Sequence, residues 1–277
     1  MTNRRMSLGR TMMYLFLLAS CVLAVFPFYW MLVIGTNKTS DVNKFPPVLT
    51  LGTHFAENLR NAFEKIAFFQ AIENSFIVAG AVTISVLLIS SMSAFAIGKL
   101  HFKGQKLIVL LVLGTMMVPQ QLSIVPNYIL INRLQLLNTR LGVMLPNLAT
   151  AFSVFWMKQN VEAIIPDEML EAAKIDGCNY WRQFWKIVLP LLQTPLATLG
   201  IITFMAQWND FTWPLIVLQK AQTRTIQIAL RNLFGVYISD YSMILAATFV
   251  SVLPTLFIFF FFSRQFVSSV TAGAVKA

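Results

Sequence analysis

A chain of 277 residues with 57% apolar and 12% charged residues is too hydrophobic for an ordinary soluble domain, in which about 25% of residues are charged. The mean hydropathy is +0.69. The net charge of +10 is spread between apolar runs and forms no dense basic stripe, which argues against nucleic-acid binding. The two cysteines (Cys21, Cys178) and two histidines (His54, His101) lie far apart, so no disulfide framework or metal site is expected.

Apolar segments long enough to span a membrane recur along the chain. A transmembrane helix needs about 20 apolar residues to cross roughly 30 Å of hydrocarbon. The stretches that meet this need are 12–34, 74–97, 107–131, 141–158, 191–218 and 243–263. We therefore predict an all-α integral membrane protein with six transmembrane helices. The third and fifth stretches contain prolines, so they are expected to line a cavity where freed backbone groups find partners.

The first stretch has some features of a signal peptide. Arg4, Arg5 and Arg10 precede it, and Leu18 to Cys21 fits a lipoprotein cleavage site. The apolar run nevertheless continues to Trp30, well beyond a typical signal sequence, so an uncleaved first helix is predicted.

Basic residues set the expected orientation. Lys99, Lys103 and Lys106 follow the second span, and the arginines precede the first, so both segments are placed in the cytoplasm. The resulting organisation is a cytoplasmic N-terminus at 1–11, a first transmembrane helix at 12–34, an extracytoplasmic loop at 35–73, a five-helix core at 74–265 with a cytoplasmic loop at 159–190, and a cytoplasmic tail at 266–277.

The loop between the fourth and fifth spans has helix start and stop signals. Pro166 suits the first helical position, and Asp167, Glu168 and Glu171 place negative charge where the helix dipole favours it. Gly177 is a natural stop, which predicts a short helix over about 166–176.

A second helix is expected to follow, capped by Asn179. Aromatic and apolar residues then recur at helical spacing, namely Trp181, Phe184, Trp185 and Val188. This pattern predicts an amphipathic helix at the membrane interface that ends near Pro190. These features fit a simple connector and a docking element equally well.

The spacing of this loop resembles a known signature. Glu171-Ala172-Ala173, then Gly177, then Ile187-Val188-Leu189-Pro190 is similar to the signature of permease subunits of binding-protein-dependent ABC importers. Other segments resemble the carbohydrate-uptake branch, and in particular the shorter maltose-type permease subunit. They include Phe26 to Trp30, Asn74-Ser75-Phe76, Ala94-Phe95-Ala96, Phe102-Lys103-Gly104, Pro119 to Pro126, Asn138-Thr139, Gly142 and Trp208 to Phe211.

The resemblance covers about residue 26 to the C-terminus and implies a type I importer permease with a cytoplasmic coupling helix between spans four and five. It implies a second, homologous permease subunit, two ATPase subunits, an extracytoplasmic solute-binding protein and a prokaryotic inner membrane. The residues it assigns to ATPase coupling are Glu168, Glu171, Ala172, Ala173, Lys174, Asp176 and Gly177. The tail ends in Val275-Lys276-Ala277 where such proteins usually end in glycine.

The chain carries no phosphate-binding Gly-x-x-x-x-Gly-Lys-Ser/Thr motif, so it is not expected to hydrolyse ATP itself. The resemblance places ATP and Mg²⁺ on the partner ATPase and no cofactor on this chain. Without paired acids, a nucleophile motif or a histidine cluster, an intramembrane enzyme is disfavoured.

Polar residues within the spans are candidates for the translocation path, because polar groups unpaired in lipid are costly. The candidates are Gln120, Gln121, Asn127, Asn147, Gln207, Trp208, Asn209 and Asp210. Amide, carboxylate and aromatic groups suit a sugar; these residues could instead satisfy unwound backbone or contact the partner subunit. An ion-coupled secondary transporter is the alternative function, but Asp210 is the only acid clearly within a predicted span.

Overall fold

The computed structural model describes residues 8–42, 44–235 and 239–274, and the elements it contains there are helices. The predicted basic residues Arg4 and Arg5 and the last three residues of the predicted tail lie outside the described residues. The chain divides into two compact units, of which one comprises residues 1–67 and 230–253 and the other residues 68–229 and 254–277.

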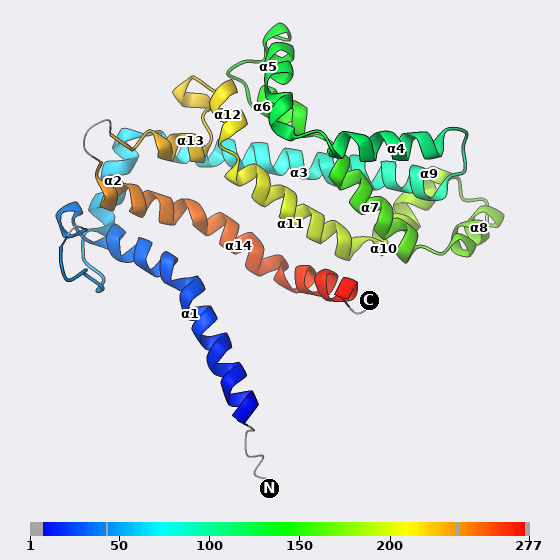
Figure 1. The fold of residues 1–277 in the computed structure, drawn as a ribbon. Helices are drawn as coiled ribbons and strands as arrows, with labels where there is room; N and C mark the ends of the chain where they lie inside the picture. Colours follow the sequence, from blue (N-terminus) through cyan, green and yellow to red (C-terminus); the bar gives the residue numbers. More distant parts are fainter. Residues whose placement is uncertain (1–7, 43, 236–238, 275–277) are drawn as a thin grey trace. The chain divides into compact units, whose positions relative to one another are not determined.

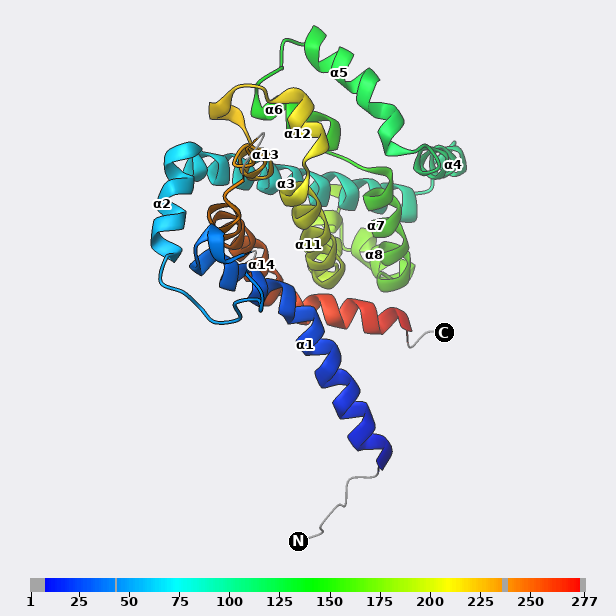
Figure 2. The ribbon, with the colours of Figure 1, turned by 60° about the vertical axis from the view of Figure 1, so that its left-hand side comes forward.

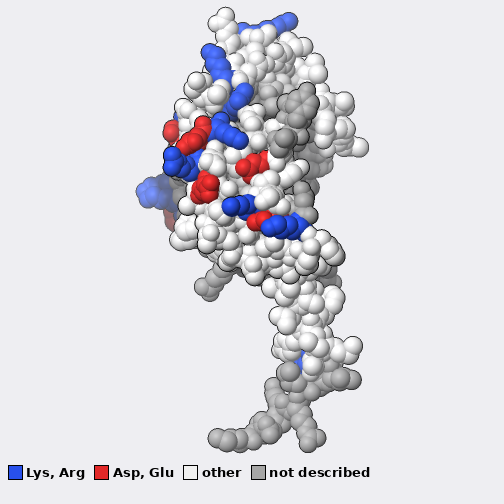
Figure 3. Space-filling view, turned by 90° about the vertical axis from the view of Figure 1, so that its left-hand side faces the viewer, with Lys and Arg blue, Asp and Glu red and all other residues white. Residues whose placement is uncertain are grey.

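The first unit contains α1 (Leu8–Thr36), α2 (Phe55–Lys65) and the first part of α14 (Tyr241–Ala274). Figure 3 shows the side of α1 as an almost uncharged surface, as expected for a helix that faces lipid. Gly35 lets α1 and α14 approach closely, because a Cβ there would lie 3.0 Å from the backbone of Ala246. Asn58 of α2 donates to the carbonyls of Gly35 (2.9 Å) and Asn37 (3.0 Å), which fixes α2 on the end of α1.

The second unit is built on the long helix α3 (Phe68–Lys99), which packs along α7 (Ala151–Ile164) and α11 (Gln193–Asn209) (Figures 1 and 2). Buried residues follow one stripe of α3 at every fourth position, namely Val78, Val82, Val86, Ser90 and Ala94. Small side chains toward its C-terminal end let α7 approach, and the Ser90 hydroxyl donates to Ser153 of α7 at 2.7 Å.

The remaining helices of this unit are short. They are α4 (Gln105–Met116), α5 (Ile124–Arg133), α6 (Arg140–Met144), α8 (Asp167–Ile175), α9 (Tyr180–Gln183), α10 (Leu189–Leu191) and α12 (Thr212–Val217). Helix α13 (Ile226–Arg231) follows in the sequence, and the division of the chain into units falls between its residues Ala229 and Leu230.

Three of the six predicted spans are long, apolar helices over Gly9–Thr36, Phe68–Lys99 and Tyr241–Ser263. The third span is a pair of helices over Gln105–Met116 and Gln120–Arg133, bent by 94° at a break that includes Pro119. This break confirms the interruption expected from the prolines. Helix α14 continues to Ala274, so most of the segment predicted as a tail from residue 266 is helical.

The fourth span differs from the prediction, whereas the interruption of the fifth was expected from its prolines. A single helix over 141–158 is wrong: α6 ends at Met144, a 3₁₀ turn with Pro146 follows, and α7 begins after Thr150. Thr150 starts the new helix because its hydroxyl accepts from the Ser153 N–H at 3.1 Å while Ser153 bonds back. The fifth span is likewise divided at Asp210, between α11 and α12.

The segment after α12 is hydrogen-bonded to α3 and to the turn that precedes α6. The Asn74 side chain of α3 donates to the carbonyls of Gln222 and Arg224, each at 2.9 Å. Asn138, with φ of 60°, accepts from the backbone N–H groups of Gln219 (2.7 Å) and Lys220 (2.9 Å). These bonds join segments up to 150 residues apart and hold α12 in place.

Candidate functional site

A polar pocket of about 420 Å³ lies where three interruptions of the helices meet. The first is the 3₁₀ turn Gln120–Ser123 after Pro119, the second is the turn Leu145–Asn147 and the third is the break at Asp210. Irregular backbone at membrane depth is tolerated where it lines a cavity, which is the arrangement here. The lining residues are Gln120, Gln121, Ser123, Ile124, Asn127, Pro146, Asn147, Ala206, Gln207, Asp210, Thr212 and Trp213.

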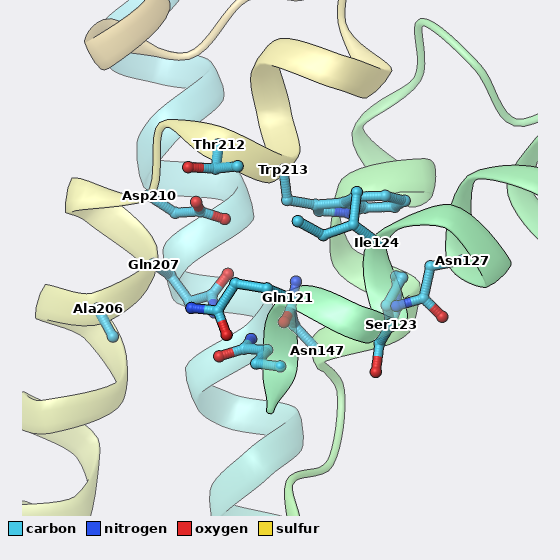
Figure 4. A pocket seen from close by; sticks show the side chains of 12 residues that line it. Gln121, Ser123, Ile124, Asn127, Asn147, Ala206, Gln207, Asp210, Thr212 and Trp213 are labelled. Atoms are coloured by element: carbon cyan, nitrogen blue, oxygen red, sulfur yellow. The ribbon is translucent and has the colours of Figure 1, made fainter. Parts of the chain in front are cut away.

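Amide side chains from different segments meet in this pocket. In Figure 4, Gln121, Asn147 and Gln207 lie next to one another, with Asp210 and Trp213 beside them. Asn147 donates to the carbonyl of Val143 at 3.1 Å, so one of its amide hydrogens is committed to its own helix turn. The others present donors and acceptors toward the cavity, which suits a ligand with many hydroxyl groups.

Asp210 has two functions in the local structure. Its backbone is extended, with φ of −66° and ψ of 124°, and this ends α11. Its carboxylate lies close to the backbone N–H groups of Thr212 and Trp213, at the start of α12. The carboxylate also belongs to the pocket lining.

Two buried polar atoms of the pocket lining have no hydrogen-bond partner among the described residues. They are Oε1 of Gln207, an acceptor, and Nε1 of Trp213, a donor. Trp213 is buried, with only 8% of its surface exposed. Most buried polar groups in proteins are hydrogen-bonded, so an orphaned donor and an orphaned acceptor in one pocket indicate a place for a ligand.

Six of the eight predicted path residues line the pocket, namely Gln120, Gln121, Asn127, Asn147, Gln207 and Asp210. Trp208 and Asn209 do not. Trp208 is 1% exposed and its ring contacts Phe76 at 4.8 Å and Phe204 at 5.7 Å, whereas Asn209 is exposed and donates to the Met205 carbonyl.

Helix geometry explains this division. Gln207 lies with Ala206 on the side of α11 that borders the pocket, and Trp208 and Asn209 point elsewhere, whereas Asp210 reaches the pocket from the break that follows the helix. The sequence interpretation missed Ser123, Thr212 and Trp213 as lining residues. Thr212 and Trp213 follow Asp210 directly in the sequence, across the break, and this proximity is the signal that could have identified them.

A short helix is present where the sequence predicted one over about 166–176: it is α8, and the loop that contains it begins at Ile165, since α7 runs to Ile164. Pro166 precedes α8, and Gly177 follows it with φ of +80°. The N–H of Cys178 donates to the Ala173 carbonyl (2.9 Å), and that of Gly177 donates to Lys174 (3.0 Å). These two bonds form a Schellman motif, which ends the helix rigidly.

Helix α8 has one face packed on its own chain and one face exposed. Leu170 and Ala173 are 5% and 7% exposed, and Leu170 joins the hydrophobic core. The exposed side chains are Glu168, Met169, Glu171, Ala172, Lys174, Ile175 and Asp176. Of the two predicted close-contact alanines, only Ala172 lies on the exposed face.

An ion pair holds the start of α8. Lys99, the last residue of α3, lies 2.8 Å from Asp167, the first residue of α8. The Lys99 side chain is 7% exposed, whereas that of Asp167 is 70% exposed. The hydrogen bond from Lys99 lowers the pKa of the Asp167 carboxyl below its ordinary value of 3.8. Neither residue was among the predicted coupling residues, because nothing near Lys99 in the sequence points to residue 167.

The segment after α8 departs from a regular amphipathic helix. Asn179 caps α9 as predicted, accepting from the Arg182 N–H at 2.8 Å, but Phe184–Val188 is π-helical. Phe184 and Val188 are buried, while Trp181 and Trp185 are 60% and 42% exposed. The two exposed tryptophans retain the expected aromatic surface for a membrane interface.

Comparison with known proteins places these features in a family. Residues 66–271 match the family described as "Binding-protein-dependent transport system inner membrane component". The chain is 34% identical to the lactose transport system permease protein LacG of Rhizobium radiobacter over 100% of both chains. It is 31% identical to the sn-glycerol-3-phosphate transport system permease protein UgpE of Yersinia pestis bv. Antiqua, over 92% of this chain and 93% of that one.

The fold also matches a solved structure. A chain of a bacterial ABC transporter involved in the import of the acidic polysaccharide alginate superposes with a TM-score of 0.83. The match covers 96% of this chain and 99% of that chain at 18% sequence identity, so it bears on the fold and not on the solute.

Proposed function

This chain belongs to the family of binding-protein-dependent transport system inner membrane components, and we propose that it forms half of the translocation pathway of an ATP-driven importer of sugars or related solutes. The observation that carries the proposal is the coexistence, in one compact unit, of a polar pocket built on broken helices and a rigid exposed helix, α8. The pocket is suited to binding a solute, and α8 is suited to docking on an ATPase.

We propose six membrane spans, as predicted from the sequence. Three are the long helices, a fourth is the bent pair Gln105–Met116 and Gln120–Arg133, and a fifth is a second bent pair, Tyr180–Leu191 and Gln193–Asn209, with an angle of 77°. The sixth is the interrupted segment of α6 and α7, which packs on α3 with its short turn at the pocket. Both termini then lie in the cytoplasm, and residues 35–73 lie outside the membrane.

We propose that α8 is the coupling helix, which docks in a cleft of a separate ATPase that holds ATP and Mg²⁺. Glu168 and Glu171 supply polar anchors and Ala172 permits close contact, while Lys174 and Asp176 flank the docking face. Ala173 and Gly177 act from within the chain: Ala173 packs against the core and Gly177 closes the Schellman motif. A lever of this kind transmits ATP-driven closure to the spans as a rigid-body movement.

The proposed assembly contains a second, homologous permease subunit, two ATPase subunits and an extracytoplasmic solute-binding protein. The loop at 35–73, with α2 fixed on the end of α1, provides the surface for the binding protein. The family description supports dependence on a binding protein.

The experiment is uptake by the complete transporter reconstituted in vesicles with ATP inside. Uptake that vanadate abolishes and an uncoupler leaves unchanged supports ATP-driven transport. Uptake that the uncoupler abolishes in the presence of ATP supports the ion-coupled alternative and contradicts the proposal.

A further inference from the structure

We infer that this subunit itself contacts the solute, and that its half of the pathway selects a neutral, polyhydroxylated solute over an anionic one. The inference rests on the proposed transport function and concerns the pocket at the break of α11 and α12. It follows from two observations: the orphaned pair Gln207 Oε1 and Trp213 Nε1, and the charge of the lining.

The two unpaired atoms require both a donor and an acceptor from the solute. Gln207 Oε1 accepts and Trp213 Nε1–H donates, and neither atom finds a partner among the described residues. A hydroxyl group both donates and accepts, so a hydroxyl of the solute can satisfy either atom. A phosphate or carboxylate group only accepts when ionised, and it would leave Gln207 Oε1 unpaired.

The charge of the pocket lining also favours a neutral solute over an anionic one. The described residues around the pocket include one carboxylate, Asp210, and no Lys, Arg or His. Sites for carboxylates and phosphates typically supply Arg, Lys or several N–H groups, because an anion taken from water needs charge-assisted hydrogen bonds. The backbone N–H groups of Thr212 and Trp213 lie beside the Asp210 carboxylate. An anionic solute would therefore meet repulsion from Asp210 and no cationic side chain among the lining residues to compensate for it.

The dimensions are compatible with such a solute. A volume of about 420 Å³ falls within the ~300–1,000 Å³ of small-molecule pockets. The named relatives include one for a neutral sugar and one for a phosphate ester, so family membership leaves this choice open. The chemistry of the pocket lining favours a neutral sugar over a phosphate ester as the solute.

The experiment measures direct binding to the complete transporter in nanodiscs, without nucleotide and without the binding protein. Saturation-transfer difference NMR is recorded with galactose and glucose, and with their matched acids galacturonate and glucuronate, at millimolar concentration. The variants are Trp213→Phe, which deletes only the N–H, Gln207→Met, which deletes the acceptor, and Asp210→Asn, which deletes the charge. Trp156→Phe is the matched control, because the Trp156 N–H is also buried and orphaned but lies outside the pocket.

We expect at least one neutral sugar to bind the wild type more strongly than its acid. Trp213→Phe and Gln207→Met should each weaken that binding by about threefold to tenfold, the loss expected for one hydrogen bond. Trp156→Phe should bind as the wild type does, and Asp210→Asn should narrow the difference between sugar and acid.

Three outcomes would overturn the inference: acids that bind as well as their sugars, neutral binding that Trp213→Phe and Gln207→Met leave unchanged, or no binding of either sugar. A thermal-shift measurement on each variant separates loss of binding from loss of folding. Because the assay uses no nucleotide, its result is independent of how transport is energised. A transporter driven by ATP that binds acids and sugars equally would leave the proposed function intact and refute only this inference.

Discussion

Lys99 and Asp167, 68 residues apart in sequence, form a 2.8 Å ion pair that joins the end of α3 to the first turn of α8. The pair is asymmetric, since the lysine is buried and the aspartate faces water. Asp167 also lies at the N-terminus of α8, where its charge favours the helix dipole. The contact connects the helix that carries the core stripe of the unit with the proposed coupling helix.

Breaking the Lys99–Asp167 pair should reduce the coupling of ATP hydrolysis to transport more than it reduces the stability of the fold. For Asp167→Asn we expect a loss of under about 1 kcal/mol in unfolding free energy, because the pair is solvent-screened on the aspartate side. Uptake per ATP hydrolysed should fall, because α8 loses its direct tie to α3. Glu162→Gln is the control: it removes the Lys158–Glu162 pair, which lies within α7 and joins no second helix. Equal transport per ATP in Asp167→Asn and Glu162→Gln would contradict the assigned role.

The pH dependence of α8 follows from the lowered pKa of Asp167. A carboxyl whose pKa is lower in the folded state stabilises it fully above its ordinary value of 3.8, and loses that contribution as the pH falls through the folded value. Amide hydrogen exchange in α8, corrected for intrinsic rates, should therefore be constant from about pH 8 to 5. Protection should decrease only below pH 4. A loss of protection between pH 5 and 7 that Asp167→Asn abolishes would show that the pair titrates differently.

Gly177→Ala tests the rigid end of α8. The glycine has φ of +80°, and a Cβ there would meet nothing within 4 Å, so the cost is backbone strain alone, about 1–2 kcal/mol. We expect that loss in thermal or denaturant unfolding, together with reduced transport. Gly177→Asn should recover much of both, because asparagine tolerates this conformation.

Gly104→Ala is the matched control for strain. Gly104 has φ of +91° and is equally unobstructed, but it lies between α3 and α4, away from α8. It should cost similar stability while leaving uptake per ATP unchanged. If Gly177→Ala and Gly104→Ala lower uptake per ATP to the same extent, backbone strain at Gly177 has no specific effect on the coupling of ATP hydrolysis to transport.

The exposed face of α8 is predicted to bind the ATPase through Ala172. Ala172→Trp should reduce the ATPase recovered with the purified permease by about tenfold or more, because a bulky residue prevents close contact. Ala163→Trp, at an exposed position of the neighbouring helix α7, is the control and should leave recovery unchanged. Undiminished recovery with Ala172→Trp would place the docking face elsewhere on the loop.

The sequence by itself determined what depends on neighbouring residues. Hydropathy marked the long spans, Pro119 marked a break, and Pro166, Gly177 and Asn179 marked the ends of α8 and the start of α9. These signals are reliable because caps, missing N–H groups and positive φ values act within one turn of helix.

The tertiary structure decided which distant residues meet. It brought Gln121, Asn147 and Gln207 into one pocket, turned Trp208 into the core, and buried Ala173 against its own chain. It also divided the fourth predicted span between Pro146 and Thr150. No local pattern specifies these outcomes, because they depend on how α3, α7 and α11 pack, and packing selects among helix faces that the sequence leaves equally apolar.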